Sequence, residues 1–336
     1  MSFRFGISDS IIKTFSAIER HYSIFLCIFV KFNIMKKTLI LLLAAALTVA
    51  CTGGKPRKVL FFGVDGLASW CVEKATDSIP DRIPNLIKLM EESAWTLEKR
   101  SVAPTSSAIN WASTFMGVPT EMHAYTKWNS KESAFKPYAV GPNGMPPTVF
   151  TLLKEQRPEA ASLCIFDWDG IAYVVDTAAV TRHQFVKWNP EELSSVEYTR
   201  QYALPEIEKG LPDLFLFYIV DVDEHGHKYG WGSPEYFDAM ARMDESLGLI
   251  LDALDKSGQR DNTILVLSSD HGGKKDRKHG TYKAEDVMAP LIVNGPGFKA
   301  GKISSPVMQY DVAAITAAAL GLSIPGEWRG RSVFEQ

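Results

Sequence analysis

The chain has 336 residues, of which 46% are hydrophobic and 22% are charged, with 36 basic and 39 acidic side chains. This composition is typical of a globular protein with a large core, and it excludes a disordered, fibrous or disulfide-stapled chain. The formal net charge of −3, without a basic stripe, argues against nucleic-acid binding as the purpose of the protein.

The first 57 residues are predicted to lie outside the folded domain. Residues 1–34 match no targeting pattern, so translation is expected to start at Met35. Residues 35–50 join two lysines to a short apolar run, which is typical of an export signal peptide. The segment Thr48-Val49-Ala50-Cys51 resembles the lipobox of bacterial lipoproteins, which implies cleavage before Cys51 and a lipid on that cysteine. An ordinary secreted protein is the alternative.

The expected location is therefore the cell envelope, on the periplasmic or the outer surface. Residues 51–57 would form the lipidated cysteine and a short linker, so that Cys51 attaches the protein to the membrane. Without residues 1–50 the chain keeps 30 basic and 37 acidic side chains, a net charge of −7. Cys71 and Cys164 are too few for a disulfide framework and are expected to be buried free thiols.

From residue 58 onward, apolar runs alternate with helical patterns. Runs without polar alternation are typical of strands covered on both faces, and they occur at 58–64, 162–166, 214–220, 263–267 and 290–293. Helices are predicted at 84–93, 107–117, 148–156, 234–256 and 311–320. This order predicts an α/β fold in which helices sandwich a largely parallel central sheet, built by a single domain at 58–334.

Acidic residues and histidines follow three of these apolar runs. In chain order they are Asp65, Asp223, His227, Asp270 and His271, with His279 a few residues later. The carboxyl ends of parallel strands form the functional crevice of such sheets, so we expect these side chains at one edge. Each motif alone is equally compatible with turn chemistry, in which the aspartate bonds backbone amides and glycines supply positive φ.

The motif after residues 214–220 has two possible registers. Asp223 and His227 are four residues apart, and so are Asp221 and His225, so the spacing alone does not choose between the pairs. Glycines at positions 226, 230 and 232 are expected to let this segment fold as a tight loop.

The combination of carboxylate and imidazole ligands indicates a metal centre. Such mixed ligands suit zinc best, with manganese as the competitor. Six ligands are enough for two divalent ions, and two ions about 4 Å apart promote in-line displacement at phosphorus.

The segment Pro104-Thr105-Ser106-Ser107 supplies a candidate nucleophile. It breaks the chain at a proline and begins a helix whose first turn carries hydroxyls. A hydroxyl at a helix N-terminus lies in a positive field, which suits both a nucleophile and a bound phosphate. Asn110, on the same helix face as Ser107, is the candidate to donate an amide hydrogen to a phosphate oxygen. The alternative role for Ser107 is an N-cap.

Together these motifs resemble the alkaline phosphatase superfamily, most closely its type I phosphodiesterase / nucleotide pyrophosphatase branch. Residues 104–125 line up without a gap with the family's Pro-Thr-Lys-Thr-Phe-Pro-Asn segment through Glu-x-His-Gly. The alignment places Ser107 on the nucleophile, Asn110 on a phosphate-binding asparagine, and Glu121 and His123 on the family's glutamate and histidine. His123 is expected to be structural.

The later motifs extend this resemblance over nearly all of 58–334. Residues 226–230, Gly-His-Lys-Tyr-Gly, are similar to the family's Gly-His-x-Tyr-Gly, which selects Asp223 and His227 over Asp221 and His225. Asp270-His271-Gly272 and His279-Gly280 match its last two metal motifs.

The resemblance implies a three-layer, alkaline phosphatase-like catalytic domain with two metal ions. It implies that one ion is held by Asp65, Ser107, Asp270 and His271, and the other by Asp223, His227 and His279. Ser107 would attack phosphorus in line, and water would hydrolyse the phosphoseryl intermediate. The implied substrate is a small-molecule phosphodiester or pyrophosphate.

Two departures from the family pattern keep other substrates open. The diesterase branch usually has threonine at the position of Ser107 and phenylalanine at that of Ala108, and serine also serves monoesterases. A phosphomonoesterase or phosphonate hydrolase is therefore the alternative within the superfamily. A non-catalytic surface lipoprotein that binds ligands is the alternative from another class. A sulfatase is not expected, because neither Ser106 nor Ser107 is followed by x-Pro-x-Arg.

Two further features have open roles. The basic insert at 274–278 either attracts an anionic substrate or is simply solvated. Four tryptophans either line a substrate pocket or pack in the core, namely Trp128, Trp168, Trp188 and Trp231.

Overall fold

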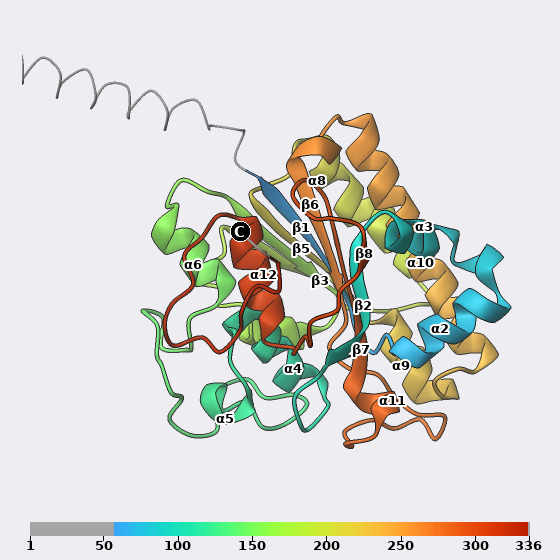
Figure 1. Ribbon diagram of the computed structural model, residues 1–336, viewed down its shortest axis with the longest axis horizontal. Coiled ribbons are helices and arrows are strands. Elements are labelled where there is room, and N and C mark those ends of the chain that lie inside the picture. Colours follow the sequence, from blue (N-terminus) through green and yellow to red (C-terminus); the bar gives the residue numbers. More distant parts are fainter. Residues whose placement is uncertain (1–56, 335–336) are drawn as a thin grey trace, which may run out of the picture. The chain divides into compact units, whose positions relative to one another are not determined.

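The central element is an eight-stranded sheet with the strand order β4-β3-β5-β1-β6-β7-β2-β8 (Figure 1). This computed structural model describes residues 57–334. The strands are β1 (Lys58–Val64), β2 (Ala94–Arg100), β3 (Ser162–Phe166), β4 (Arg182–Phe185), β5 (Leu214–Ile219), β6 (Thr263–Ser268), β7 (Met288–Asn294) and β8 (Gly301–Lys302).

The middle of the sheet is parallel, as the sequence predicts. β1 pairs in parallel with β5 on one side and β6 on the other, so that Phe61 lies opposite both Leu216 and Val266. β3 and β4 continue the parallel half, whereas β7 runs antiparallel to β6 and to β2. The predicted α/β fold with a largely parallel sheet is confirmed.

Three strands are absent from the sequence-based prediction because none is a continuous apolar run. β2, with the sequence Ala-Trp-Thr-Leu-Glu-Lys-Arg, mixes buried and exposed positions. β4 is exposed along its whole length at one edge of the sheet, and β8 at the other edge has two residues.

Helices cover both faces of the sheet. They are α2 (Ser69–Ser78), α3 (Pro84–Glu91), α4 (Ser107–Met116), α5 (Thr120–His123), α6 (Val149–Gln156), α7 (Ser195–Tyr198), α8 (Leu204–Glu208), α9 (Asp221–Tyr229), α10 (Pro234–Lys256), α11 (Ala284–Val287) and α12 (Asp311–Ala319). All five predicted helices are among them.

The core divides into two apolar clusters, one on each side of the sheet. Phe61 points into the cluster formed with α4, α6 and α12, and its neighbour Phe62 points into the cluster formed with α2, α3 and α10. This alternation follows from the period of two in a strand, and both faces are apolar because both are covered. Cys71 and Cys164 are buried free thiols, as expected.

Several predictions concern residues that lie outside the described part of the chain. They are the start at Met35, the signal peptide at 35–50, the lipid on Cys51 and the linker up to residue 56. Among residues 57–334, no helix combines the length and the apolar character needed to cross a membrane.

The sheet places several loops at one edge. β1, β5 and β6 run in the same direction, so their carboxyl ends lie side by side. Asp65 directly follows β1, α9 begins two residues after β5, and Asp270 comes two residues after β6. In Figure 1 this edge lies near α9 and α11.

Candidate metal centre and catalytic pocket

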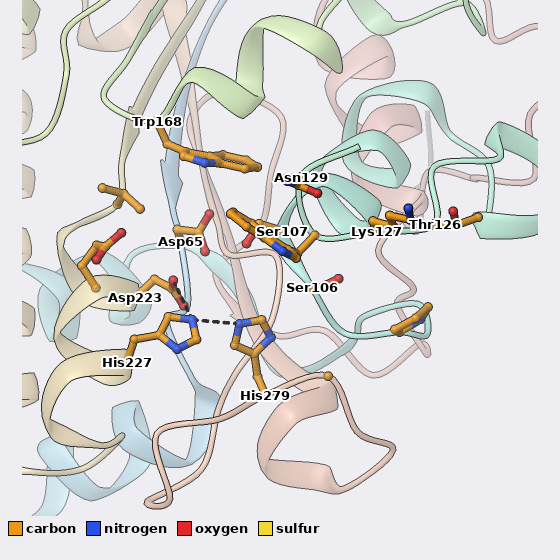
Figure 2. Close-up of a pocket in the computed structure, with 15 residues that line it drawn as sticks. Asp65, Ser106, Ser107, Thr126, Lys127, Asn129, Trp168, Asp223, His227 and His279 are labelled. Carbon is orange, nitrogen blue, oxygen red and sulfur yellow. Dashed lines mark hydrogen bonds and ion pairs between the residues drawn. The ribbon is translucent and has the colours of Figure 1, made fainter. Parts of the chain in front are cut away.

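The carboxyl edge of the sheet brings all six predicted carboxylate and histidine ligands together. Two groups have ligand atoms within 4.8 Å of one another, namely Asp65 with Asp270 and His271, and Asp223 with His271 and His279. His227 adjoins the second group, because its Nε2 atom lies 3.1 Å from Nε2 of His279 and 3.4 Å from an Asp223 carboxylate oxygen (Figure 2). His271 thus belongs to both groups and connects them.

The three histidines present the same ring nitrogen to the centre. Their Nδ1 atoms lie near backbone carbonyl oxygens, at 2.9 Å from Gly272 for His271, 2.6 Å from Thr105 for His279 and 3.2 Å from Arg277 for His227. A carbonyl oxygen only accepts hydrogen bonds, so Nδ1 carries the proton and Nε2 keeps a free lone pair. The facing lone pairs of His227 and His279 repel each other unless a cation lies nearby.

Burial keeps two of these imidazoles neutral. It lowers the pKa of His271 to about 3, and that of His279 to about 2, where the neighbouring His271 adds to the effect. A neutral imidazole is the form that binds a metal ion.

In both Asp65 and Asp270, one carboxylate oxygen accepts hydrogen bonds that orient the side chain, and the other oxygen accepts none. Asp65 accepts hydrogen bonds on Oδ2 from Trp111 Nε1, at 2.9 Å, and from the Tyr218 hydroxyl. Asp270 accepts one on Oδ1 from the Gly66 amide, at 3.1 Å. The free oxygens, Asp65 Oδ1 and Asp270 Oδ2, lie 3.6 and 3.2 Å from Nε2 of His271.

These free carboxylate oxygens fit a cation site. Asp65, Asp223 and Asp270 are buried, and in the described part of the chain each has one oxygen without a hydrogen-bond partner. Burial raises the pKa of Asp65 and Asp223 well above the usual range, and that of Asp270 to about 7. A buried anion without a partner is costly, and a divalent cation bound by carboxylates and neutral imidazoles removes that cost.

The structure separates the two registers on α9. Asp221 accepts hydrogen bonds from the Arg242 guanidinium at 2.9 and 3.0 Å and pairs with His225 at 2.9 Å, which anchors α9 to α10. Asp223 and His227, on another side of the same helix, lie at the candidate metal centre. The pair selected by the family resemblance is thus the pair at the centre.

The segment that carries this pair is a helix, not the tight loop expected from its glycines. Asp223 and His227 are four residues apart on α9, so they share one helix face. Position 226 lies inside the helix. It is a glycine because a Cβ atom there would come within 2.6 Å of the Trp231 indole. Close packing, rather than chain reversal, explains that glycine.

Ser107 lies next to the candidate metal centre. It is the first residue of α4, follows Ser106 at the N-cap, and its Oγ atom lies 3.3 Å from Nε2 of His271. Neither hydroxyl caps the helix, since Ser106 makes no side-chain cap hydrogen bond and Ser107 Oγ faces the centre. The N-cap position thus belongs to Ser106 and not to Ser107.

Asn110 does not lie where the sequence places a phosphate-binding group. Its Oδ1 atom accepts a hydrogen bond from the Val102 amide at 2.7 Å, and its Nδ2 atom donates to backbone carbonyls of the loop before α4. It is fully buried and does not line the pocket. Asn129, which belongs to no recognisable sequence motif, does line it (Figure 2).

A cavity of about 690 Å³ opens over the candidate metal centre. Its lining includes Asp65, Ser107, Asp223, His227 and His279, together with Lys127, Trp128, Asn129, Trp168 and Glu224. In Figure 2 the Trp168 indole lies on the side of Asp65 away from the two histidines. The volume is in the range of small-molecule sites and leaves room for more than a phosphate group.

The four tryptophans divide between the two roles left open by the sequence. Trp128 and Trp168 line the cavity, and Trp188 does not. Trp231 is a core residue with 1% of its surface exposed, and its ring lies 5.2 Å from that of His227 and 5.8 Å from that of His279.

Other residues noted in the sequence have structural or surface positions. His123 is fully buried, and its ring bonds the Ser113 hydroxyl and accepts from the Tyr125 amide, each at 3.0 Å. Glu121 is exposed. The buried position of His123 agrees with its expected structural role.

The sheet with helices on both faces, and the clustered carboxylates and imidazoles beside a helix-start serine, agree with the resemblance to the alkaline phosphatase superfamily. Within it, the chain belongs to the type I phosphodiesterase / nucleotide pyrophosphatase family, whose sequence profile matches residues 59–293. The resemblance seen in the motifs is therefore confirmed.

Individual relatives match parts of the chain. Human GPI ethanolamine phosphate transferase 2, catalytic subunit, is 36% identical over 135 residues, which is 38% of this chain and 14% of the relative. The venom phosphodiesterase CdcPDE of Crotalus durissus collilineatus is 26% identical over 233 residues, which is 66% of this chain and 26% of the relative. The chain thus spans about a quarter or less of these relatives.

Among solved structures, murine ectonucleotide pyrophosphatase / phosphodiesterase 5, in an inactive form in complex with AMP, shares the fold. The TM-score is 0.62 at 17% sequence identity, and the match covers 80% of this chain and 96% of that one.

Proposed function

We propose that the chain hydrolyses phosphoric esters and that small-molecule phosphodiesters or pyrophosphates are its substrates. The observation that carries the proposal is the position of Ser107 Oγ, 3.3 Å from His271, beside two groups of metal-type ligands. A hydroxyl that lines the cavity next to such ligands suits nucleophilic attack at phosphorus. Membership of the family supports the same class of reaction.

We propose two divalent cations as cofactors, zinc in preference to manganese. Asp65, Ser107, Asp270 and His271 would hold one, and Asp223, His227 and His279 would hold the other. When bound, the cations would supply the positive charge that stabilises the attacking and leaving oxygens. The free carboxylate oxygens and the inward Nε2 lone pairs support this assignment.

The residues of the chain would position and attack the substrate. Ser107, at the start of the ten-residue helix α4, lies in a helix field that favours negative charge on its oxygen. Its attack on phosphorus forms the Oγ–P bond, releases the leaving group in line and gives a phosphoseryl intermediate, which water then hydrolyses. Asn129 takes the role first expected of Asn110, because it lines the cavity and can donate to a phosphate oxygen.

Two other functions compete with this one. A phosphomonoesterase or phosphonate hydrolase is favoured by serine at position 107, where the diesterase branch usually has threonine. The cavity of about 690 Å³ argues for a diester instead, since it has room for a second ester substituent. A non-catalytic binding module is opposed by the complete set of candidate ligands beside Ser107.

We further propose export and attachment to the membrane through a lipid on Cys51. This part of the proposal depends on the sequence of residues 35–51. The names of similar proteins, a venom phosphodiesterase and an ectonucleotide pyrophosphatase, agree with an extracytoplasmic role.

Metal analysis and three chromogenic esters test the function. We expect close to two zinc ions per chain and faster cleavage of bis-p-nitrophenyl phosphate than of p-nitrophenyl phosphate or p-nitrophenyl sulfate. Faster cleavage of the monoester would favour the alternative enzyme. Absence of turnover with all three esters at full metal content would favour the binding module.

The nucleophile is tested by a matched pair of variants. Ser107→Ala should abolish turnover while most of the metal is retained, because the other six ligands remain. Ser107→Thr should restore activity, because it returns a hydroxyl to the same position. Turnover by Ser107→Ala would sink the nucleophile assignment.

A further inference from the structure

Two segments at the rim of the cavity expose aromatic and basic side chains. The first segment is 126–147, between α5 and α6, and the second is 274–283, between β6 and α11. Both border the same cavity, since its lining includes residues 126–129 of the first segment and residues 279–280 of the second. Figure 1 shows both segments at one end of the sheet, near α5 and near α11.

The aromatic side chains of these segments lie in solvent. The exposed fraction is 59% for Trp128, 52% for Phe135 and 65% for Tyr138 on the first segment, and 86% for Tyr282 on the second. Val140 is 54% exposed beside them. Scattered single apolar residues need no explanation, but this number within two segments that border one cavity indicates an interaction surface.

The charge of these segments is opposite to that of the chain as a whole. They contain eight lysines or arginines and two acidic residues, whereas the complete chain has 36 basic and 39 acidic residues. Lys131, Lys136, Lys275, Lys278 and Lys283 are all exposed. An acidic protein thus carries a basic rim around its cavity, which is complementary to an anionic partner.

We propose that this aromatic and basic rim docks on the surface of a lipid bilayer that contains anionic lipids. Tryptophan and tyrosine prefer the boundary between headgroups and acyl chains, and lysines next to them are attracted by anionic headgroups. Phe135 and Val140 have no polar group and gain most from an apolar phase. A nucleic acid would use the lysines but would leave these two side chains in water.

Docking does not depend on the proposed hydrolysis and can be measured without turnover. Its consequence is that the mouth of the cavity would face the bilayer. If the protein is also lipidated at Cys51, the rim adds a second attachment. One acyl chain together with a basic patch binds a membrane far more tightly than either does alone.

The experiment uses the chain from residue 51 onward with Cys51→Ser, so that no acyl chain contributes. This chain retains all residues of the core and of the site, which lie within 57–334. Co-sedimentation is measured with vesicles of phosphatidylcholine alone and with vesicles containing phosphatidylglycerol. We expect binding to the anionic vesicles that weakens as salt is raised.

Two variants remove the two components of the surface. Phe135→Ser/Tyr138→Ser removes apolar area, and Lys131→Glu/Lys136→Glu reverses two charges on the same segment. Each should lower the vesicle partition coefficient at least about tenfold. None of these residues lines the cavity, so hydrolysis of a soluble ester should be unchanged.

A matched control reverses two charges elsewhere. Lys88→Glu/Lys299→Glu makes the same charge change on α3 and on the loop after β7, and it should leave vesicle binding nearly unchanged. The proposal is overturned if the parent chain does not bind anionic vesicles or if the control loses binding as much as the rim variants. Tighter binding to a mixed-sequence oligonucleotide than to the vesicles would also overturn it. Unchanged unfolding midpoints verify that every variant is folded.

Discussion

The indole Nε1 of Trp231 donates a hydrogen bond to the carbonyl oxygen of Gly66, at 2.8 Å. Gly66 follows Asp65, so this bond ties the segment after α9 to the loop after β1. The same indole fills the space beside Gly226 and Gly273, where added Cβ atoms would lie 2.6 and 2.2 Å from the ring. One buried side chain therefore supports backbone next to ligands from three parts of the chain.

Trp231→Phe should weaken metal binding more than it weakens the fold. Phenylalanine lacks the Nε1 donor and the second ring, so the backbone at Gly66 and the rings of His227 and His279 lose their support. We expect metal affinity to fall about tenfold or more, as for other residues that orient ligands. Chelator competition measures the affinity. The control is Trp188→Phe, because Trp188 does not line the cavity. Equal affinity in both variants would show that Trp231 only packs.

The two histidines of α9 should respond differently to substitution. His227→Ala removes an inward Nε2 atom, so about one of the two ions should be lost on purification, together with activity. His225→Ala breaks the pair with Asp221 and should cost about 1 kcal/mol of stability at full metal content. Metal analysis and thermal unfolding of both proteins distinguish these effects. Loss of metal in His225→Ala would contradict the assignment.

Substitution of Asn129 should lower activity, whereas substitution of Asn110 should lower stability. Asn129→Ala removes a donor from the cavity, and we expect kcat to fall about 100-fold or more without a change in the unfolding midpoint. Asn110→Ala leaves the buried Val102 amide without its acceptor, which should cost about 1–3 kcal/mol of unfolding free energy. Ester hydrolysis and urea unfolding test the pair. A selective loss of activity in a fully stable Asn110→Ala protein would return the phosphate-binding role to Asn110.

His123 should make stability depend on pH. Burial lowers its pKa to about 3, from the value of about 6.5 that is usual for histidine. Between these values the unfolded chain binds a proton that the folded chain does not, so the free energy of unfolding falls as pH falls from 6.5 toward 3. The slope from one such group reaches about 1.4 kcal/mol per pH unit.

Substitution of His123 isolates this contribution. His123→Asn should make the profile between pH 4 and pH 6.5 less steep, measured by urea unfolding of the metal-free protein. His183→Asn, on the exposed strand β4, is the control for removal of a histidine outside the core. An identical slope in His123→Asn and the parent protein would mean that His123 does not carry the effect.

The sequence predicts the sheet and the ligand positions well because both depend on local signals. β1, β5 and β6 are unbroken apolar runs covered on both faces, and Asp65 and Asp270 follow two of them. Once the strands are parallel, the residues after them meet at one edge. The fold class and the grouping of the six ligands therefore follow from the pattern.

Features that depend on contacts distant in sequence were not predictable. Asn110 shares a helix face with Ser107, but the loop from Val102 to Ser106 folds over that face and uses the carboxamide. Asn129 lies in a segment without periodicity, so nothing in the sequence marks it as part of the cavity. Likewise, Arg242 on α10 engages Asp221, and the spacing within α9 contains no information on that contact.

The basic insert is held in place by its main chain. The Lys274 carbonyl accepts from the Trp231 amide at 3.3 Å, its amide donates to the Lys278 carbonyl at 3.0 Å, and the Arg277 carbonyl lies 3.2 Å from His227 Nδ1. These bonds need no particular side chain at the three positions. The outer charge of the loop can therefore be redesigned while the cluster of candidate ligands keeps its geometry. Substitution of the exposed side chains of this loop would change the surface to which the protein binds and leave the candidate ligands in place.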